Sequence, residues 1–265
     1  MSESPILENL AVTHGEVCDR GKEREENQDS VCHSRLAIGE LFLVADGIGG
    51  YRGGAVASKM VVEGFVGYLA SLPSDYPPEQ AIREAAFQAN ASIYAAASAP
   101  DAAYRQMGST VVLALLVRNG SGVNAWIGHI GDSRAYLARE GRLNHLTKDH
   151  SAVQSLLDCN LITPEQAANH PDASVLTRSL GHRPEVEIDI SIVPLQPGDR
   201  LMLCSDGLWG YSPEPQIEAI VVDPSLSAEA AAQALLSLAL AAGGHDNIGI
   251  ELAHLNPPST FPASS

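Results

Sequence analysis

Short apolar runs separated by polar turns make up most of the hydrophobic pattern along this chain of 265 residues. Several of these runs have the length and the β-branched content of strands. They cover residues 12–17, 41–45, 110–117, 123–130, 134–138, 186–193, 200–205 and 247–253. In the run VEIDISIV at 186–193, apolar and polar residues alternate. Such alternation predicts a strand that is buried on one face.

Four longer segments carry apolar residues at helical spacing, namely 55–72, 78–97, 213–221 and 227–242. The last of them begins with a serine N-cap, Ser227, followed by an early glutamate, Glu229. The strands cluster in the middle of the chain, and the helices form pairs on either side. This grouping predicts an α+β fold with separate helix and sheet layers, and it argues against a regular βαβ alternation.

Two segments interrupt or end this pattern. Residues 149–180 are polar with short helical signals, and we interpret them as a flap inserted between strands. Residues 256–265 are rich in proline and serine, so we expect a disordered tail there. No run approaches the roughly 18 uncharged apolar residues of a membrane span. The N-terminus lacks the basic and apolar regions of a signal peptide, so we expect a cytoplasmic protein with no membrane partner.

Cysteine spacing and net charge limit the kinds of site and binding partner that the sequence allows. Cys18, Cys32, Cys159 and Cys204 are scattered without a CxxC pair, which favours reduced thiols over disulfides or a zinc site. A formal net charge of −16 argues against nucleic acid and anionic membranes as partners. The same charge would also repel a phosphate ligand, so a phosphate site would need cations close to it.

The glycine-rich stretch VADGIGGYRGGAVAS at 44–58 resembles a phosphate-binding loop only superficially. Gly47 and Gly49 would need a third glycine at position 52, where Arg52 stands, and no G-K-[ST] follows. Both the dinucleotide-binding and the P-loop interpretations therefore fail. We expect instead that these glycines let the chain turn sharply behind Asp46.

Aspartates recur where apolar runs end. FLVADGIGG at 42–50 and LMLCSDGLWG at 201–210 each place Asp-Gly directly after a strand-like run. Asp132 lies at another strand-to-turn junction, and Asp29 and Asp246 lie beside further strand-like runs. A single Asp-Gly is ordinary turn chemistry. Five such aspartates in one chain are harder to explain by turns alone.

Buried carboxylates without partners are costly, so they tend to converge on cations. A set of carboxylates with no clustered histidine or cysteine suits Mg²⁺ or Mn²⁺ better than zinc. Two such ions can hold a bridging hydroxide that attacks phosphorus in line. The residues alone therefore favour a binuclear-metal phosphohydrolase.

Eight short motifs in this chain resemble, in sequence order, those of the type 2C family of metal-dependent serine/threonine protein phosphatases. The residues within these motifs are most similar to those of bacterial stand-alone members. The motifs are R-x-x-N-Q-D (24–29), ADGIGG (45–50), GST (108–110), IGDSRAYL (130–137), LTKDHS (146–151), LTRSLG (176–181), SDGLWG (205–210) and GGHDNI (243–248). The resemblance extends from about residue 10 to 253. It implies a four-layer α-β-β-α sandwich with two central antiparallel sheets, and one catalytic domain over residues 1–255.

The resemblance also implies a metal-binding role for five residues. Asp46 matches the aspartate that bridges two core metals, and Gly47 matches the glycine that ligates through its carbonyl oxygen. Asp206 and Asp246 match the other aspartate ligands. Asp29 matches an acid that supports metal-bound waters or contacts a metal. The implied cofactor is Mn²⁺ or Mg²⁺, as two core ions with or without a weaker third.

Further roles follow from the same resemblance. Asp132 resembles the carboxylate that holds the third, looser metal together with Asp206. Arg24 matches the arginine that grips the substrate phosphate, although a surface ion pair with a neighbouring acid is the alternative. Asn247 is the usual companion of the last aspartate and has a supporting role. Arg134 is expected to pair with an acid inside the fold.

The chain departs from the family pattern at two positions. Ile48 stands where many eukaryotic members carry a histidine proposed as the general acid, and isoleucine cannot donate a proton. The nearest histidine in sequence to a ligand is His245, which we interpret as incidental. Gly210 replaces an acid that binds the third metal in some relatives, so that ion would bind weakly or rely on water.

Other polar residues receive structural interpretations. His129 lies in an apolar strand and His150 in a turn before the flap, and neither has metal-ligand spacing to another histidine. Ser133 has no G-x-S-x-G elbow around it, which argues against a serine nucleophile.

The resemblance implies a monomeric phosphatase acting on phosphoserine and phosphothreonine, without a phosphoenzyme. Its partners would be phosphorylated proteins, including a cognate serine/threonine kinase or the substrates of that kinase. One alternative is a phosphatase of an anti-sigma antagonist in a partner-switching system, although the chain length leaves no room for an attached sensor domain. The other is a non-catalytic pseudophosphatase that binds phosphoproteins, but all the matched aspartates are present.

Overall fold

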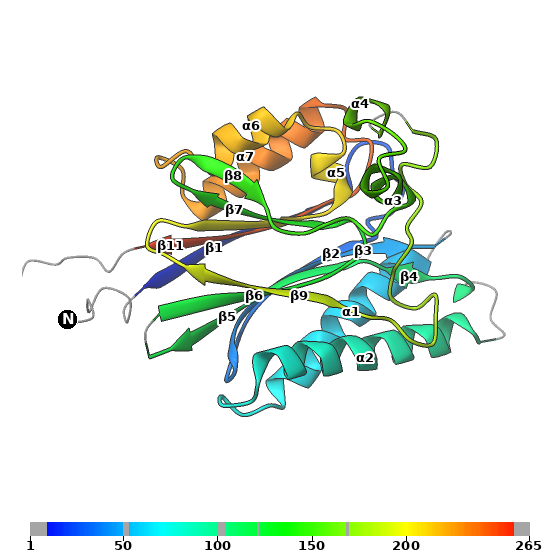
Figure 1. The fold of residues 1–265 in the computed structure, drawn as a ribbon, viewed down its shortest axis with the longest axis horizontal. Coiled ribbons are helices and arrows are strands. Elements are labelled where there is room, and N and C mark those ends of the chain that lie inside the picture. The colour runs from blue at the N-terminus through cyan, green and yellow to red at the C-terminus, as the bar shows by residue number, and fades with distance from the viewer. Residues whose placement is uncertain (1–9, 50–52, 100–103, 121, 168–169, 257–265) are drawn as a thin grey trace, which may run out of the picture.

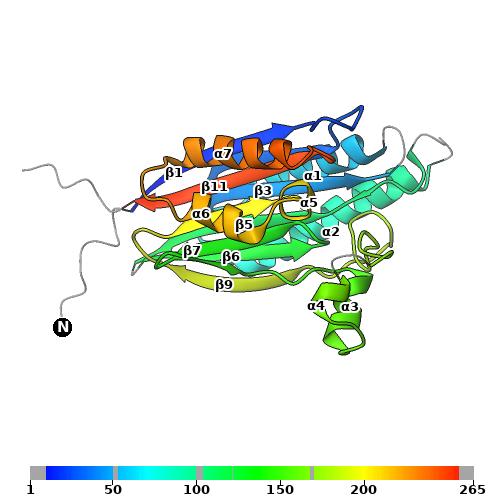
Figure 2. The same cartoon turned by 90° about the horizontal axis from the view of Figure 1, so that it is seen from above.

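Two antiparallel sheets lie face to face, and a pair of helices covers the outer face of each (Figure 1). The computed structural model describes residues 10–49, 53–99, 104–120, 122–167 and 170–256. The four layers run helix, sheet, sheet, helix, and the view from above shows the strands of the two sheets crossing the molecule in similar directions (Figure 2). This arrangement confirms the predicted α+β class and the four-layer sandwich.

The first sheet has the strand order β1-β11-β10-β7-β8, with every neighbouring pair antiparallel. Its strands are β1 (Ala11–Asp19), β7 (Arg134–Arg139), β8 (Arg142–His145), β10 (Arg200–Cys204) and β11 (Ile248–Asn256). β11 lies inside the sheet between β1 and β10, and all of its residues except Asn256 are buried.

The second sheet has the order β2-β3-β5-β6-β9, with the short strand β4 pairing with the end of β3. Its strands are β2 (Asp29–Leu36), β3 (Gly39–Ile48), β4 (Gly108–Ser109), β5 (Val111–Asn119), β6 (Gly122–Ile130) and β9 (Asp189–Leu195). β9 is an edge strand that pairs only with β6, and its residues are mostly exposed or half-buried. The alternating run at 186–193 therefore forms a strand, although the strand begins only at Asp189.

The helices pack where the grouping along the chain predicts. α1 and α2 cover the second sheet, and α6 and α7 cover the first (Figure 1). The helices are α1 (Gly53–Ala70), α2 (Pro78–Ala97), α3 (Ala152–Asp158), α4 (Pro164–Ala167), α5 (Asp206–Trp209), α6 (Glu214–Val221) and α7 (Ala228–Ala241). Ser227 caps α7 by accepting from the N–H of Ala230, as its sequence indicates. None of the helices in the described residues is both long and apolar enough to cross a membrane.

Three apolar layers hold these elements together. One fills the space between the sheets, with Phe42 and Val44 among its members. The other two lie under the helix pairs, with Phe65 under α1 and Leu235 under α7. Because both faces of the inner strands are buried, the strands form rigid supports for the loops at their ends.

Several elements were not predicted. β2 and β8 are short or polar edge strands without a strong apolar run, so hydrophobic pattern alone misses them. α3 and α4 lie in the segment 149–180, which follows β8 and precedes β9 in the chain, and they project to one side of the sandwich (Figure 2). Residues 168 and 169 of the flap lie outside the described residues. So does the predicted tail, except for Asn256, which is instead the last residue of β11.

Candidate metal centre

The predicted acidic residues lie where strands end. Asp29 begins β2 and Asp46 lies near the end of β3, and the two are register partners across the antiparallel pair. Directly opposed residues in such a pair have Cα atoms about 4.5–5.5 Å apart. Asp132 lies in the turn between β6 and β7, Asp206 begins α5 directly after β10, and Asp246 comes just before β11. Both sheets therefore supply acids to this site.

The two Asp-Gly pairs are explained by close backbone contacts. A Cβ atom on Gly47 would lie 2.0 Å from the carbonyl oxygen of Gly54 and 2.7 Å from that of Gln28, the residue before Asp29. A Cβ atom on Gly207 would lie 1.9 Å from the carbonyl oxygen of Asn247, the residue after Asp246. Each glycine thus lets an aspartate-bearing segment pack against the segment that carries another aspartate.

This result corrects the expected sharp turn behind Asp46. The strand β3 continues through Gly47 to Ile48, where Ile48 pairs with Gly108. The first glycine with a positive φ in this stretch is Gly49, at 140°. The requirement at Gly47 is therefore lack of a side chain, and the turn comes two residues later.

Hydroxyl groups join the acidic segments to one another. Ser205 donates from its hydroxyl to a carboxylate oxygen of Asp29 at 2.6 Å, which links β10 to β2. The hydroxyl of Thr110 accepts from the N–H of Asp46 at 3.0 Å and lies 2.7 Å from the hydroxyl of Ser133, the residue after Asp132. Sequence reasoning gave Ser205 no role and expected Thr110 only to cap or pack, although the two lie inside the SDG and GST motifs.

The acids strongly affect one another's protonation. Burial raises the pKa of Asp46 well above its ordinary value, and the charges of Asp29, Asp206, Asp132 and Asp246 raise it further. Asp46 therefore lies within electrostatic reach of all four other predicted metal-binding acids. It is the centre of the group.

The same two causes act on three other acids of the group, Asp29, Asp132 and Asp206. Burial is the larger cause in each case, followed by a neighbouring negative charge or offset by a hydrogen bond. The pKa of Asp29 rises to about 7, that of Asp132 to about 8 and that of Asp206 to about 6. Without cations, these carboxylates hold protons or repel each other.

The donor set fits hard divalent cations. The convergent side chains near Asp46 are carboxylates, and oxygen ligands of this kind suit Mg²⁺ and Mn²⁺. A divalent cation would remove both the mutual repulsion and the desolvation cost that raise these pKa values. Within the described residues, no three acidic, histidine or cysteine side chains already surround one point as ligands. The described acids thus gather at one place without forming a ready ligand set.

Arg24 lies at this site and not on a neighbouring glutamate. Its guanidinium donates to a carboxylate oxygen of Asp246 at 2.6 Å, although the two residues are 222 positions apart. The side chain of Arg24 remains 53% exposed. The half-exposed guanidinium of Arg24 therefore lies at the rim of the acidic group, bonded to one of the predicted metal ligands.

Asn247 holds the segment that carries Arg24. Its side-chain amide donates to the carbonyl oxygens of Arg20 and Glu26, at 2.9 and 3.0 Å. Its side-chain oxygen accepts from the N–H of Gln28 at 2.8 Å. Three hydrogen bonds from one buried amide fix the loop between β1 and β2, which agrees with the supporting role expected for it.

Arg134 pairs with an acid inside the fold, as predicted. It forms two hydrogen bonds with the carboxylate of Asp149, at 3.0 and 2.7 Å. Its guanidinium carbon lies 3.4 Å from the centre of the Trp209 ring, a cation–π contact. Trp209 in turn donates to the backbone oxygen of Asp132 at 3.1 Å. This cluster supports the Asp132 turn and leaves no role for Arg134 in phosphate binding.

The positions that depart from the family pattern have defined surroundings. His245 bonds to Glu23 at 2.7 Å, and its ring centre lies 5.2 Å from that of Tyr211. Gly210 donates to the backbone oxygen of Asp206 at 2.7 Å, and a Cβ at Gly210 would lie 2.7 Å from that oxygen. An acid in place of Gly210 would therefore require this turn to shift.

The sequence of this chain is similar to those of known phosphatases. A model of the family described as protein phosphatase 2C matches residues 20–241. The phosphatase PstP of Mycobacterium tuberculosis is 38% identical over 92% of this chain, but this chain spans only 45% of PstP. The phosphatase PhpP of Streptococcus pneumoniae is 35% identical over 91% of this chain and 96% of PhpP.

Solved structures agree with these sequence matches. A serine/threonine phosphatase of S. agalactiae has a TM-score of 0.86 and 30% identity, covering 93% of this chain and all of the other. The catalytic domain of PstP in complex with two manganese ions has a TM-score of 0.80 and 33% identity, covering 93% of this chain and 99% of that one. The resemblance noted in the sequence is confirmed, and the chain belongs to the protein phosphatase 2C family.

Proposed function

We propose that this chain is a metal-dependent phosphatase that hydrolyses phosphoserine and phosphothreonine in proteins. The observation that carries the proposal is the position of Asp46, which lies opposite Asp29 near the end of the β2–β3 pair and within electrostatic reach of the other acids of the site. A group of carboxylates this crowded is stable only with protons or cations, and the oxygen donors select Mg²⁺ or Mn²⁺. Relatives named as serine/threonine phosphatases, one of them with two manganese ions, support the same activity.

Asp46, Asp206, Asp246 and the carbonyl of Gly47 would hold two core ions, with Asp29 supporting them. When bound, the ions would supply an activated water for in-line attack on phosphorus and neutralise the phosphoryl oxygens. Asp132 and Asp206 would hold a third, weaker ion. The buried hydrogen bonds of Ser205 and Thr110 keep Asp29 and Asp46 in position for this binding.

Arg24 would bind the phosphoryl group of the substrate. If Asp246 held a cation, its carboxylate would attract the Arg24 guanidinium less strongly, and Arg24 would be free to bind an anion. It is exposed, reaches the rim of the site and can form paired hydrogen bonds to a phosphate. Bound cations would also make the site locally positive, and they would thereby offset the repulsion of a phosphate that the net charge of −16 implies.

The proton for the leaving alkoxide would come from water. Ile48 cannot donate one, and His245 is engaged with Glu23. Because serine and threonine alkoxides are poor leaving groups, protonation of this oxygen matters more for them than for an aryl phosphate. Aryl phosphates therefore test the metal centre without testing the proton donor.

We assign the flap at 149–180 to substrate choice, since its second residue, His150, bonds to Gly131, the residue before Asp132. Residues 1–255 would act as one catalytic domain and work as a monomer. Phosphorylated proteins would be its partners. The phosphatase would remove phosphoryl groups that a serine/threonine kinase adds.

The test is hydrolysis of an aryl phosphate in Mn²⁺ by the Asp46→Ala protein. Loss of a central ligand should lower the rate by more than about 10³-fold, as for other groups that stabilise transition-state charge. Asp75→Ala is the matched control, because Asp75 is exposed in the segment between α1 and α2. Retained hydrolysis in a folded Asp46→Ala protein would refute the proposal. A parent protein that binds phosphoprotein in Mn²⁺ without turnover would instead support the pseudophosphatase alternative.

A further inference from the structure

One histidine holds both backbone polar groups of the glycine before Asp132. The N–H of Gly131 donates to Nδ1 of His150 at 3.1 Å, and the carbonyl oxygen of Gly131 accepts from the N–H of His150 at 2.7 Å. The carbonyl oxygen of Asp132 accepts from Trp209. These three hydrogen bonds, two of them between Gly131 and His150, help to fix the turn that presents Asp132.

This turn needs such support because its backbone is unusual. Gly131 has a φ of 108°, a conformation open to few residues other than glycine. A Cβ atom at this position would also lie 2.6 Å from Cγ2 of Thr110, the residue whose hydroxyl holds the N–H of Asp46. Glycine provides the shape of the turn but no side chain to anchor it, so its position depends on outside partners.

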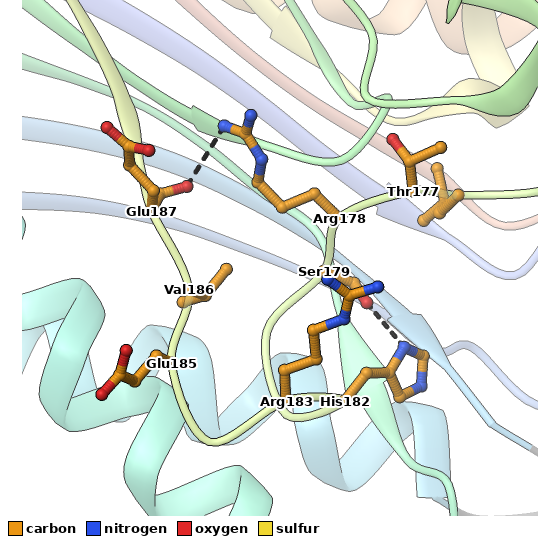
Figure 3. A pocket seen from close by; sticks show the side chains of 9 residues that line it. Thr177, Arg178, Ser179, His182, Arg183, Glu185, Val186 and Glu187 are labelled. Carbon is orange, nitrogen blue, oxygen red and sulfur yellow. Dashed lines mark hydrogen bonds between the residues drawn. The ribbon is translucent and has the colours of Figure 1, made fainter.

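His150 lies at the start of the flap (149–180), and the other side of its ring faces the end of this segment, residues 176–180, which we call the return leg. Its Nε2 lies 3.1 Å from a carboxylate oxygen of Asp189, and Arg178 donates to the other oxygen of that carboxylate. Arg178 also donates to the backbone oxygen of Glu187, across a pocket of about 340 Å³ at the return leg of the flap (Figure 3). The N–H of Thr177, on the same leg, donates to the carbonyl oxygen of His150.

These contacts set the protonation of the ring. Because an N–H points at Nδ1, that nitrogen carries the lone pair, and Nε2 carries the proton that it donates to Asp189. The residue is 8% exposed, and its ring centre lies 4.6 Å from that of the buried His129. Each ring nitrogen thus has one distinct partner: Nδ1 the Asp132 turn, and Nε2 the Asp189–Arg178 pair.

We propose that His150 is a positioning residue, which fixes the Gly131–Asp132 turn through Nδ1 and connects it to the return leg of the flap through Nε2. It holds Asp132 beside Asp206, where the weaker cation would bind. This inference rests on the proposed function for the meaning of that cation. Sequence reasoning assigned His150 only a structural place, because its partners come from β6, β9 and the flap.

The two nitrogens can be tested separately with two isosteric substitutions. The side-chain oxygen of asparagine can take the place of Nδ1, whereas the side-chain amide of glutamine can take the place of Nε2. Manganese binding is measured by electron paramagnetic resonance on the complete chain. His150→Gln should weaken the weakest bound Mn²⁺ by about 10-fold or more, as loss of groups that orient ligands commonly does, and His150→Asn should change it by less than about twofold.

The amide of Gly131 gives a second readout in the metal-free protein. Its hydrogen exchange, followed by NMR, should accelerate in His150→Gln and stay slow in His150→Asn. Equal effects of both substitutions on Mn²⁺ affinity and exchange would show a packing role and overturn the proposal, as would a reversed order or no change. Neither readout requires turnover. If the parent protein hydrolyses no phosphate ester while the contrast holds, the proposed function fails and the positioning role stands.

Discussion

The acidic group around Asp46 and the side chain of Glu251, in the middle of β11, share one feature: burial disfavours the charged form of their carboxyl groups. Glu251 is 1% exposed, and neither of its carboxylate oxygens has a hydrogen-bond partner in the described residues. It lies opposite Glu16 across the β1–β11 pair. Burial, with the charge of Glu16 as a second cause, raises the pKa of Glu251 to about 9.

What differs is access. Asp46, Asp206 and Asp246 lie at strand ends, are only partly buried and have loops and Arg24 beside them. Glu251 points from the middle of a strand into the space between the sheets, on the same side as Ala253. A cation can reach the first group, whereas a proton is the simplest way to neutralise Glu251. A raised carboxyl pKa alone therefore does not identify a functional site, and the position relative to strand ends does.

The largest effect that would sharpen this comparison comes from Asp206→Asn. Hydrolysis of an aryl phosphate in Mn²⁺ should fall by more than about 10³-fold. In the metal-free protein at pH 8 the same change should raise the melting temperature by a few degrees, because it removes one charge from a group of repelling acids, and about 1 kcal/mol corresponds to 2–4 °C in a chain of this size.

The two readouts separate a metal ligand from a structural acid. Mn²⁺ should stabilise the parent protein and stabilise Asp206→Asn much less, in line with the binding free energy lost. Asp75→Ala, in the exposed segment between α1 and α2, should behave like the parent in both assays. A destabilised metal-free Asp206→Asn protein would mean that this carboxylate makes favourable contacts without a cation.

A smaller effect is expected at Arg24, which gives the acidic group around Asp46 a basic neighbour of a kind that Glu251 does not have among its described contacts. Arg24→Gln should raise KM for an aryl phosphate by about 10-fold or more, as loss of a charge-assisted phosphate contact would. Manganese affinity should stay equal or rise, since Asp246 loses its competing partner. Arg35→Gln is the matched control, because Arg35 is exposed and pairs with Glu40 at the β2–β3 hairpin. Unchanged KM in Arg24→Gln would leave its pair with Asp246 as a purely local contact.

How far the sequence predicts this molecule depends on the range of each signal. The layers follow from periodicity, and α2 matches its predicted range of 78–97 because a long amphipathic helix leaves a strong local pattern. β2 was missed because DSVCHSRL is polar and lies at a sheet edge. A strand of this kind is defined by its neighbour β3, which the local sequence does not reveal.

The candidate site divides in the same way. The aspartates stand out because Asp-Gly after an apolar run is a local pattern. Their supports do not, because Ser205 bonds to Asp29 at a separation of 176 residues and His150 bonds to Gly131 from a separate turn. The bond between Arg24 and Asp246 joins residues 222 positions apart and equally leaves no local pattern. Predicting such contacts requires the packing of both sheets.

The smallest effect on hydrolysis is expected at Glu251 itself, and the stability of its variant tests the other half of the comparison. The pKa of Glu251 is about 9 in the folded protein against 4.5 ordinarily. Between these pH values the native state holds a proton that the unfolded state has lost, so stability falls as the pH rises through this window. Glu251→Gln removes that loss. The variant should nearly equal the parent near pH 4.5 and exceed it by several kcal/mol, at most about 5 kcal/mol, at pH 8.

Urea unfolding in EDTA at several pH values measures this difference. Glu16→Gln is the matched control, because it removes the facing charge and leaves Glu251 buried, so it should give the same sign and a smaller gain. Aryl phosphate hydrolysis should stay within about twofold of the parent in both variants, since neither residue lies among the acids that affect Asp46. A constant stability difference between pH 4.5 and 8 would mean that Glu251 titrates normally, and the contrast between the two acidic regions would then rest on metal binding alone.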